Sequence, residues 1–436
     1  MDRQADIPQK RTNPFRYAIG MFGMSIPVNM FKTYAAIFYV VNLGLATKQF
    51  ALVLFIYTFV DAIDNPVYGL LSDRTRTRWG RRRPWMVIGT PLLILFFILF
   101  FSPPEFVSER SLFIYVLLMY ILTGTLDSLV GANYGALFPE LFTDEFRRAK
   151  ANGMRQVFQL AAMIISIALT PLIADRIGYT NTAILYGILA LAVILYCTYG
   201  CHEKKEYASM ERPAVMASLK ALVTNPKFWI FGLTNAFYTA AIALVQQAVP
   251  FFVIYSLNLD KHNSAFMLGT VALVAIASIV FWVWMVKRVT LLPAWRAALV
   301  VLALGFIPLY FANDLISAIV FCSIIGFGVA GVMATLDLIA ARIMDEDAKK
   351  YGIRREGLFI SAMNVMNRLG GLFISLGYLL VHFLYGFESG DQPGLDPDGA
   401  SRFLMVIFPF MAMVVCCAFS WFMHFRNGKD HTETQA

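Results

Sequence analysis

Long apolar runs are the feature that most constrains how this chain can fold. About twelve of them follow one another along the 436 residues, and a helix needs about 20 apolar residues to cross a bilayer. The mean hydropathy of +0.64 and a charged fraction of only 15% are atypical of soluble proteins. The runs lack the alternation of barrel strands, which leaves helices that satisfy their own backbone groups in lipid. The expected spans are residues 16–43, 50–71, 85–102, 112–138, 153–174, 180–200, 228–256, 264–286, 294–311, 314–340, 357–385 and 402–424.

The pattern therefore predicts an all-α membrane protein with twelve transmembrane helices, and the distribution of Lys and Arg predicts its orientation. Counted over alternate loops, 28 of the 36 basic residues lie on one side of the membrane, and such residues concentrate in cytoplasmic loops. We expect both termini in the cytoplasm, no removable signal peptide, and an integral protein of a bacterial inner membrane. Topology also explains the net charge of +8, so we expect no nucleic-acid partner.

A polar and basic stretch divides the predicted spans six and six. We expect residues 1–200 to form an N-terminal six-helix bundle, 201–227 a cytoplasmic linker loop, and 228–436 a C-terminal bundle with a short cytoplasmic tail. Similar charged segments precede spans five and eleven. Repeated halves are typical of transporters that bind solute between them. We expect a monomer in contact with membrane lipids.

Two carboxylates lie in the second predicted span. Asp61 falls about 17 Å from the exterior end, near the midplane, at a rise of about 1.5 Å per residue. Asp64 and Asn65 follow at helical spacing, so all three face one way. Such oxygens suit a coupling cation, either Na⁺ or a shared proton. The alternative is a buried salt bridge, for which Lys32 at a similar depth is a candidate partner that would favour protonation.

Two more spans carry polar stripes that include an arginine. Arg155 and Gln156 lie in span five, and Asn364 and Arg368 lie in span eleven. Guanidinium groups there can bind hydroxyl or acidic groups of a solute, although polar stripes also hold helices together. Asp127 in span four either serves function or pairs with an arginine.

The loop after span two is crowded with arginine and contains Gly80 and Pro84. Topology alone favours basic residues there, but a tight turn would also allow an ordered cytoplasmic gate, with Glu140 among the acceptors. The predicted gate residues are Asp73, Arg74, Arg78, Gly80, Arg81, Arg83, Asp144 and Glu145.

The five cysteines lie in or beside apolar runs and show no metal-ligand spacing. We therefore expect no metal site and no disulfide. The five histidines show no acid motif of an enzyme, so a membrane-embedded enzyme is only a remote alternative.

Several motifs occur in a specific combination. They are Asp61–Pro66 with Gly69, Trp79–Trp85, Asp144 and Glu145 with Arg147 and Arg155, and Asp345, Asp347, Gly352 and Arg354–Gly357. In this order, over nearly the whole chain, they resemble the glycoside-pentoside-hexuronide:cation symporters of the major facilitator superfamily. The resemblance implies two six-helix bundles and import of a glycoside, hexuronide or related solute with H⁺ or Na⁺ by alternating access. It implies no cofactor beyond that ion.

The resemblance also assigns roles to single residues. It implies that Asp61 belongs to a cation site and Arg155 to a sugar cavity, and it places Ser25 where the family has a sugar-binding aspartate. Compared with the family, the predicted cavity has fewer groups that accept hydrogen bonds from a sugar, and it has three cations, Lys32, Arg155 and Arg368. This difference favours an anionic or amphiphilic solute, such as a hexuronide or sulfonated sugar. A lysolipid or amphiphile carrier of the same fold is the alternative. The expected solute-binding residues are Ser25, Lys32, Asp127, Arg155, Gln156, Asn364 and Arg368.

Overall fold

The protein is built from helices. The computed structural model describes residues 12–105, 109–142, 145–202, 224–351 and 356–425, and none of these residues forms a strand. The helices are α1 (Pro14–Ala36), η1 (Ile37–Asn42), α2 (Thr47–Arg74), α3 (Arg83–Phe100), α4 (Glu109–Leu141), α5 (Glu145–Met163), η2 (Ile164–Leu169), α6 (Thr170–Gly200), α8 (Pro226–Tyr255), η4 (Lys261–Asn263), α9 (Ser264–Val289), α10 (Leu291–Tyr310), α11 (Leu315–Tyr351), α12 (Glu356–Arg368), α13 (Gly370–Tyr385), α14 (Pro397–Arg402), η5 (Phe403–Ile407) and α15 (Phe408–Phe422).

Local sequence explains where several of these helices begin. Pro14 and Pro226 stand in the first turn, where a missing N–H costs nothing. The side chains of Asn13, Asn225 and Asp396 each accept a hydrogen bond from a backbone N–H of the turn that follows, at 3.0, 3.1 and 2.8 Å. These caps fix the helix ends at the positions where the polar loops meet the apolar runs.

The helices coincide with the predicted apolar runs. Among the described residues, nine helices are long and apolar enough to cross a membrane. One of them, Lys150–Gly200, contains two predicted spans and is interrupted by non-helical backbone at Gly178. The helices that carry Lys32 and Asp61 are not among the nine. The all-helical membrane fold is therefore confirmed, while the count of twelve spans stays a prediction.

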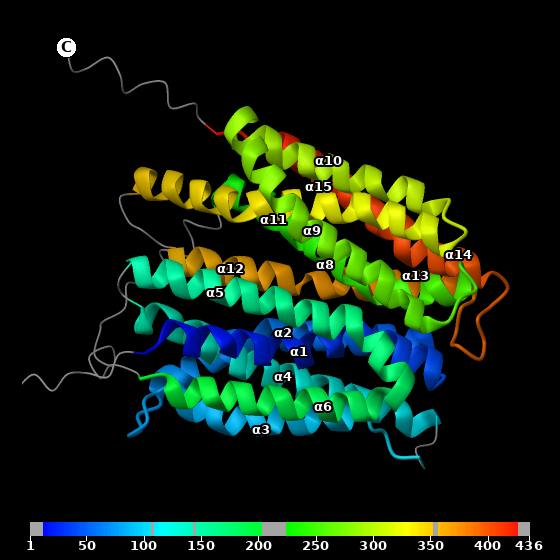
Figure 1. Ribbon diagram of the computed structural model, residues 1–436, viewed down its shortest axis with the longest axis horizontal. Helices are drawn as coiled ribbons and strands as arrows, with labels where there is room; N and C mark the ends of the chain where they lie inside the picture. Colours follow the sequence, from blue (N-terminus) through cyan, green and yellow to red (C-terminus); the bar gives the residue numbers. More distant parts are fainter. Residues whose placement is uncertain (1–11, 106–108, 143–144, 203–223, 352–355, 426–436) are drawn as a thin grey trace, which may run out of the picture.

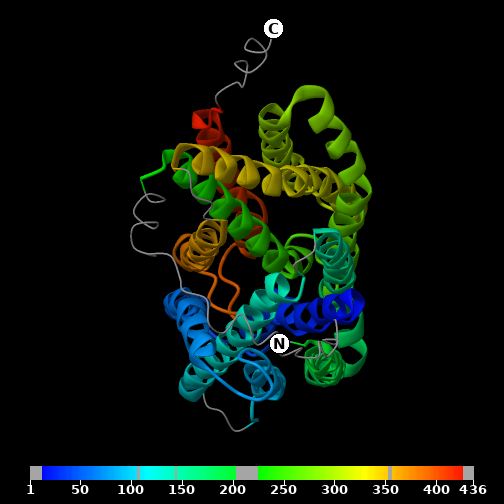
Figure 2. The ribbon, with the colours of Figure 1, turned by 90° about the vertical axis from the view of Figure 1, so that its left-hand side faces the viewer.

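The helices form two groups that follow the order of the chain (Figure 1). Helices α1–α6, from blue to green, lie in the lower part of the view, and α8–α15 lie above them. Figure 2 shows the same division along the helices. We call these groups the N-terminal and C-terminal halves. They meet through α2 against α13 and η2 against α9. The exact boundaries of the two halves and of the linker loop, at residues 200 and 228, stay a prediction, since residues 203–223 lie outside the described part of the chain.

Hydrogen bonds and an ion pair join the two halves at one end of the molecule. This is the end with the 43–46 and 386–396 connections, which the charge pattern predicts to be exterior, and we call it the exterior end. The contacts there link Thr47 N to the Glu388 carbonyl at 2.5 Å, Gly390 N to the Val40 carbonyl at 2.9 Å, Ser375 Oγ to the Ala51 carbonyl at 2.7 Å, and His262 to Asp175 at 3.9 Å.

Near the opposite end, two of the described carboxylates, Glu140 and Glu346, each pair with a cation of their own half. Arg81 pairs with Glu140 inside the N-terminal half, and Lys227 pairs with Glu346 inside the C-terminal half. Together with the bonds at the exterior end, these pairs describe a conformation in which the exterior ends of the halves are held together.

Helices α10 and α11 pack with almost no space at Gly328. A Cβ added there would lie 2.7 Å from Leu302 Cα and 2.8 Å from its backbone nitrogen. Because backbone atoms cannot rotate away, we expect Gly328→Ala to destabilise the protein by about 1–3 kcal/mol. Thermal unfolding in detergent would measure this as a lower midpoint.

The matched control is Gly153→Ala on α5. No heavy atom lies within 4 Å of an added Cβ at that position, and alanine favours a helix over glycine by about 1 kcal/mol. We expect the control to unfold at the same or a higher temperature. Equal midpoints for the two variants would contradict the packing argument.

Candidate functional site

An ion pair joins the two halves about midway along α2. The carboxylate of Asp61 pairs with the guanidinium of Arg368, at the end of α12. Nη1 of Arg368 also donates to the backbone carbonyl of Asp61 at 2.9 Å and to Ser128 Oγ at 3.1 Å. The side chains of the pair are only 14% and 21% exposed. Low exposure reduces dielectric screening, so the attraction between the two charges is stronger than at a protein surface.

Two hydroxyl groups complete the surroundings of this carboxylate. Tyr57, one turn earlier on α2, and Ser128 on α4 each donate a hydrogen bond to Asp61 Oδ1 at 3.1 Å. Hydroxyl oxygens can donate, accept or coordinate a hard cation. The cluster can therefore hold a cation in the N-terminal half whenever Arg368 moves away.

Asp64 is buried one turn further along α2. It accepts a hydrogen bond from Thr125 Oγ1 at 2.8 Å. Since Thr125 and Ser128 are three residues apart on α4, both carboxylates face that helix. Asp64 makes no ion pair with any described residue. The side chain of Asn65, the third predicted cation-site residue, lies outside the described part of the chain.

Lys32 lies beside Asp127 and not beside Asp61. Its Nζ is 3.5 Å from Asp127 Oδ2, and its side chain is 49% exposed. Helix α1 packs against α5 and α6, whereas α2 packs against α4 and α13. Equal depth in the membrane therefore did not bring the two groups together. The interpretation of Lys32 as the partner of Asp61 is wrong, and Arg368 holds that position.

Arg155 on α5 has a buried nitrogen, Nε, with no hydrogen-bond partner among the described atoms. Its guanidinium lies over the ring of Phe138, 5.2 Å from the centroid. The Phe138 ring stacks on Tyr17, which in turn stacks on Tyr134 with the ring centroids 4.5 Å apart. The hydroxyl of each tyrosine donates to the backbone carbonyl of the other at 3.0 Å. An unpaired buried donor costs about 1–3 kcal/mol. The position therefore suits an oxygen of a ligand.

The other predicted solute-binding residues are spread over three helices. Gln156 on α5 and Asn364 on α12 have exposed side chains, and Ser25 is buried on α1. Asn367, next to Arg368 on the α12 stripe, accepts a hydrogen bond from Asn235 Nδ2 at 2.8 Å within the C-terminal half. This part of the stripe holds helices together, as the packing alternative expects.

The arginine-rich loop is anchored to its own half. Arg81 Nη2 and Arg82 Nε lie 2.6 and 2.9 Å from the same oxygen of Glu140 on α4. Arg83 Nε donates to a backbone carbonyl of α6 at 3.0 Å. Two cations on one carboxylate oxygen make a charge-assisted contact between the loop and α4.

A glycine turn shapes this loop. Gly80 has φ of +106°, where residues with a Cβ are strained, so the turn requires glycine. Arg78 beside it is exposed. The remaining predicted gate positions lie outside the described residues, as a whole for Asp144 and by their side chains for Asp73, Arg74 and Glu145.

Comparison with known proteins places the chain in a family. The family described as MFS/sugar transport protein matches residues 16–427. The chain belongs to this family. It is therefore a transporter of the sugar transport family, which confirms the resemblance seen in the motifs and sets the enzyme alternative aside.

Relatives agree with this assignment, and a solved structure has the same fold. The sugar transport protein is 24% identical to the isoprimeverose transporter of Lactiplantibacillus pentosus, over 83% of this chain and 80% of that one. It is also 24% identical to the putative glycoside/cation symporter YagG of Escherichia coli, over 82% and 80%. The nucleoside transporter NupG superposes with a TM-score of 0.71 at 11% identity, covering 94% and 99% of the two chains. That likeness shows the fold alone.

Sequence reasoning missed three hydroxyl groups of this transporter's central site. Tyr57 precedes Asp61 by four residues, a spacing that could have identified it. Thr125 and Ser128 gave no such signal, because serine and threonine are common in membrane helices and their role depends on which helix packs against α4. Arg82 was likewise indistinguishable from its arginine neighbours before its contact with Glu140 was known.

Proposed function

We propose that this sugar transport protein is a cation-coupled symporter of a glycoside, hexuronide or related organic solute. The Asp61–Arg368 ion pair carries the proposal, because its two members belong to different halves. A charge change on Asp61 therefore alters the attraction between the halves as well as the local site. One relative is named for isoprimeverose transport and another as a putative glycoside/cation symporter, which supports sugar-type solutes.

In the proposed mechanism, the coupling cation competes with Arg368 for Asp61. A proton on the carboxylate, or Na⁺ held by Asp61 with the Tyr57 and Ser128 hydroxyls, weakens the attraction and lets the halves rearrange. A ligand shifts such an equilibrium only by its different affinity for the two conformations. The guanidinium at bonding distance opposes both a proton and Na⁺ on Asp61, so either cation competes with Arg368, and uptake under separate H⁺ and Na⁺ gradients would identify the coupling ion.

The proposed solute contacts centre on Arg155. The Arg155 guanidinium, whose Nε has no partner among the described atoms, and the half-exposed ammonium of Lys32 are the two cations of the proposed site. The carboxylate of Asp127, beside Lys32, is a hydrogen-bond acceptor. Phe138, under the Arg155 guanidinium, lies eleven residues after Asp127 on α4, about 16 Å along the axis, so the two places would bind different ends of a solute. The cations would bind an acidic group, and the carboxylate would accept from hydroxyls. Neutral hydrogen-bonding groups would come from Ser25, Gln156 and Asn364.

We further propose that residues 1–200 and 228–436 move as two bodies connected by 201–227. Both termini would lie in the cytoplasm of a bacterial inner membrane, and a monomer surrounded by lipids would be functional. The cytoplasmic gate would involve the arginine-rich loop, including Arg81 and Arg83, and its contact with Glu140 supports an ordered loop.

Uptake into liposomes that contain the purified protein tests this function. Glycosides, hexuronides, sulfonated sugars and lysolipids would be offered with an imposed pH gradient or Na⁺ gradient. We expect a sugar-type solute to accumulate only while a cation gradient exists, and an ionophore that dissipates that gradient to abolish the accumulation. Uptake that lysolipids compete and sugars do not would contradict the proposal and favour the amphiphile carrier.

A further inference from the structure

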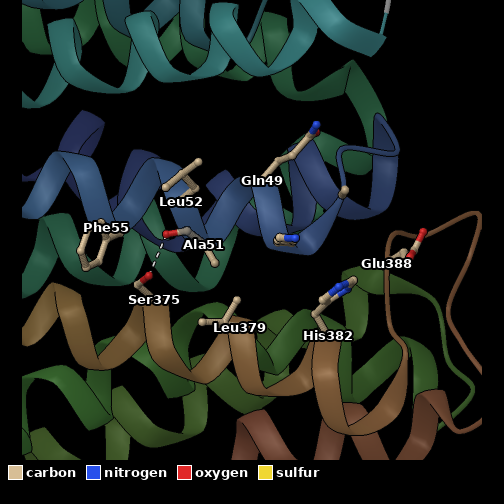
Figure 3. Close-up of a pocket in the computed structure, with 10 residues that line it drawn as sticks. Gln49, Ala51, Leu52, Phe55, Ser375, Leu379, His382 and Glu388 are labelled. Carbon is tan, nitrogen blue, oxygen red and sulfur yellow. Dashed lines mark hydrogen bonds between the residues drawn. The ribbon is translucent and has the colours of Figure 1, made fainter.

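A pocket lies between α2 and α13 at the exterior end (Figure 3). Its volume is about 540 Å³, within the range of about 300–1,000 Å³ typical of small-ligand sites. The hydrogen bond from Ser375 Oγ to the Ala51 carbonyl connects the two helices at one side of it (Figure 3). The pocket is separate from the Asp61 site, because Asp61 lies almost two turns beyond Phe55, the deepest lining residue on α2.

The lining changes from polar to apolar along the helix axes. Lys48 and Gln49 stand in the first turn of α2, while Leu52 and Phe55 follow one and two turns deeper, about 6 and 10 Å along the axis. On the antiparallel α13, His382 lies toward the exterior end and Leu379 one turn deeper, both facing α2 (Figure 3). A bilayer shows the same gradient from headgroups to hydrocarbon.

The apolar part of the pocket is open at the surface of the molecule, on a helix that we expect to lie in lipid. The side chains of Leu52 and Phe55 are each 45% exposed, and they lie in α2, which the sequence predicts to span the membrane. Exposed apolar side chains in such a helix contact acyl chains. A molecule that enters from the membrane therefore reaches the pocket without crossing the exterior solution.

The polar part carries one charge of each sign. Within the described part of the chain, neither Lys48 nor Glu388 makes an ion pair, and both line the pocket. His382 Nδ1 is buried and has no hydrogen-bond partner among the described atoms. A ligand that supplies an anion to Lys48 and His382 and a cation to Glu388 would satisfy all three groups.

We propose that this pocket binds an aminophospholipid of the exterior leaflet through its phosphoethanolamine headgroup. The phosphate accepts hydrogen bonds from Lys48 and His382, and the ammonium donates to Glu388. The acyl chain lies along Leu52, Phe55 and Leu379. An anionic phosphatidylglycerol lacks the ammonium, and the quaternary amine of phosphatidylcholine has no N–H to donate, so both fit less well.

The two sides of the headgroup site belong to different halves of the molecule. Lys48 and Gln49 come from the N-terminal half, and His382 and Glu388 from the C-terminal half. A lipid that touches both sides binds only while the exterior ends are together. Bound phosphatidylethanolamine therefore stabilises the exterior-closed conformation, in proportion to its preference for that state.

Competitive lipid retention tests the proposal independently of transport. The full-length protein would be placed in nanodiscs of equal phosphatidylethanolamine, phosphatidylglycerol and phosphatidylcholine, extracted in detergent, and its retained lipids quantified by mass spectrometry. We expect phosphatidylethanolamine to be enriched. Lys48→Ala and Glu388→Gln are each expected to lower its affinity about tenfold, because each removes a charge-assisted hydrogen bond. Leu379→Trp is expected to reduce retention of all three lipids by filling the apolar part.

The matched control is Arg176→Ala, an exposed cation near the exterior end that does not line the pocket. We expect it to retain lipid as the wild type does. Equal retention of the three lipids by the wild type would overturn the proposal. So would Lys48→Ala and Glu388→Gln variants, folded by circular dichroism and gel filtration, that retain as much phosphatidylethanolamine as the Arg176→Ala variant.

Discussion

Replacing Asp61 by asparagine is expected to abolish cation-driven accumulation of solute in membrane vesicles while leaving solute exchange. Asparagine keeps the shape of the side chain and can still hydrogen-bond Tyr57 and Ser128, but it neither titrates nor attracts Arg368. The cation then has no carboxylate to compete for, so its gradient no longer drives transport. Accumulation ratios with and without a gradient, measured beside counterflow exchange, separate the two activities.

Loss of fold must be distinguished from loss of coupling. Removing one member of a buried ion pair leaves the other charge uncompensated, which costs about 3–5 kcal/mol. We therefore expect the double variant Asp61→Asn, Arg368→Gln to be more stable than Asp61→Asn alone, yet still unable to accumulate solute. The thermal midpoints of the two variants test this difference.

Asp64→Asn is the matched control for charge in α2. Asp64 lies in the N-terminal half, as Asp61 does, and accepts a hydrogen bond from Thr125. It makes no ion pair with any described residue of the other half. We expect this variant to keep gradient-driven accumulation, with a smaller loss of rate. Full accumulation by Asp61→Asn, or complete loss of accumulation in Asp64→Asn alone, would contradict the role assigned to the Asp61–Arg368 pair.

Replacing Arg155 by alanine is expected to weaken solute binding about tenfold to a hundredfold. A hydrogen bond to a charged group contributes about 1.5–3 kcal/mol, and about 1.4 kcal/mol corresponds to tenfold in affinity. Arg155 has an unpartnered buried Nε and a guanidinium fixed over Phe138, so little reorganisation precedes binding. Ligand-induced shifts of the thermal midpoint, titrated with the transported solute, give the affinities.

Two further variants show which property of Arg155 matters. Arg155→Lys keeps the charge but loses the planar fork, so we expect an intermediate loss if the solute binds two guanidinium nitrogens. Arg288→Ala removes a cation that lies over Trp284 near the end of α9 and should leave affinity unchanged. Equal affinities in Arg155→Ala and the wild type would remove this residue from the proposed solute site.

Several features followed from the sequence because their causes are local. A run of about 20 apolar residues becomes a helix in lipid whatever its neighbours, since the helix satisfies its own backbone groups. The positions of Lys and Arg predicted the orientation by the same kind of local argument. The spacing of Asp61 and Asp64 also predicted that both would face one way, and in the structure both bond to α4.

The partners of the charged side chains required the tertiary structure. Asp61 pairs with Arg368, 307 residues away along the chain, although Lys32 lies at a similar predicted depth. Depth follows from counting residues along one helix, whereas a partner depends on which helices touch and which faces they turn toward each other. In lipid, that choice depends on close packing summed over many side chains, as between Gly328 and α10. The sequence by itself determined the helices, their predicted orientation and the family, but only packing decided that Arg368 meets Asp61 and that a pocket lies between α2 and α13.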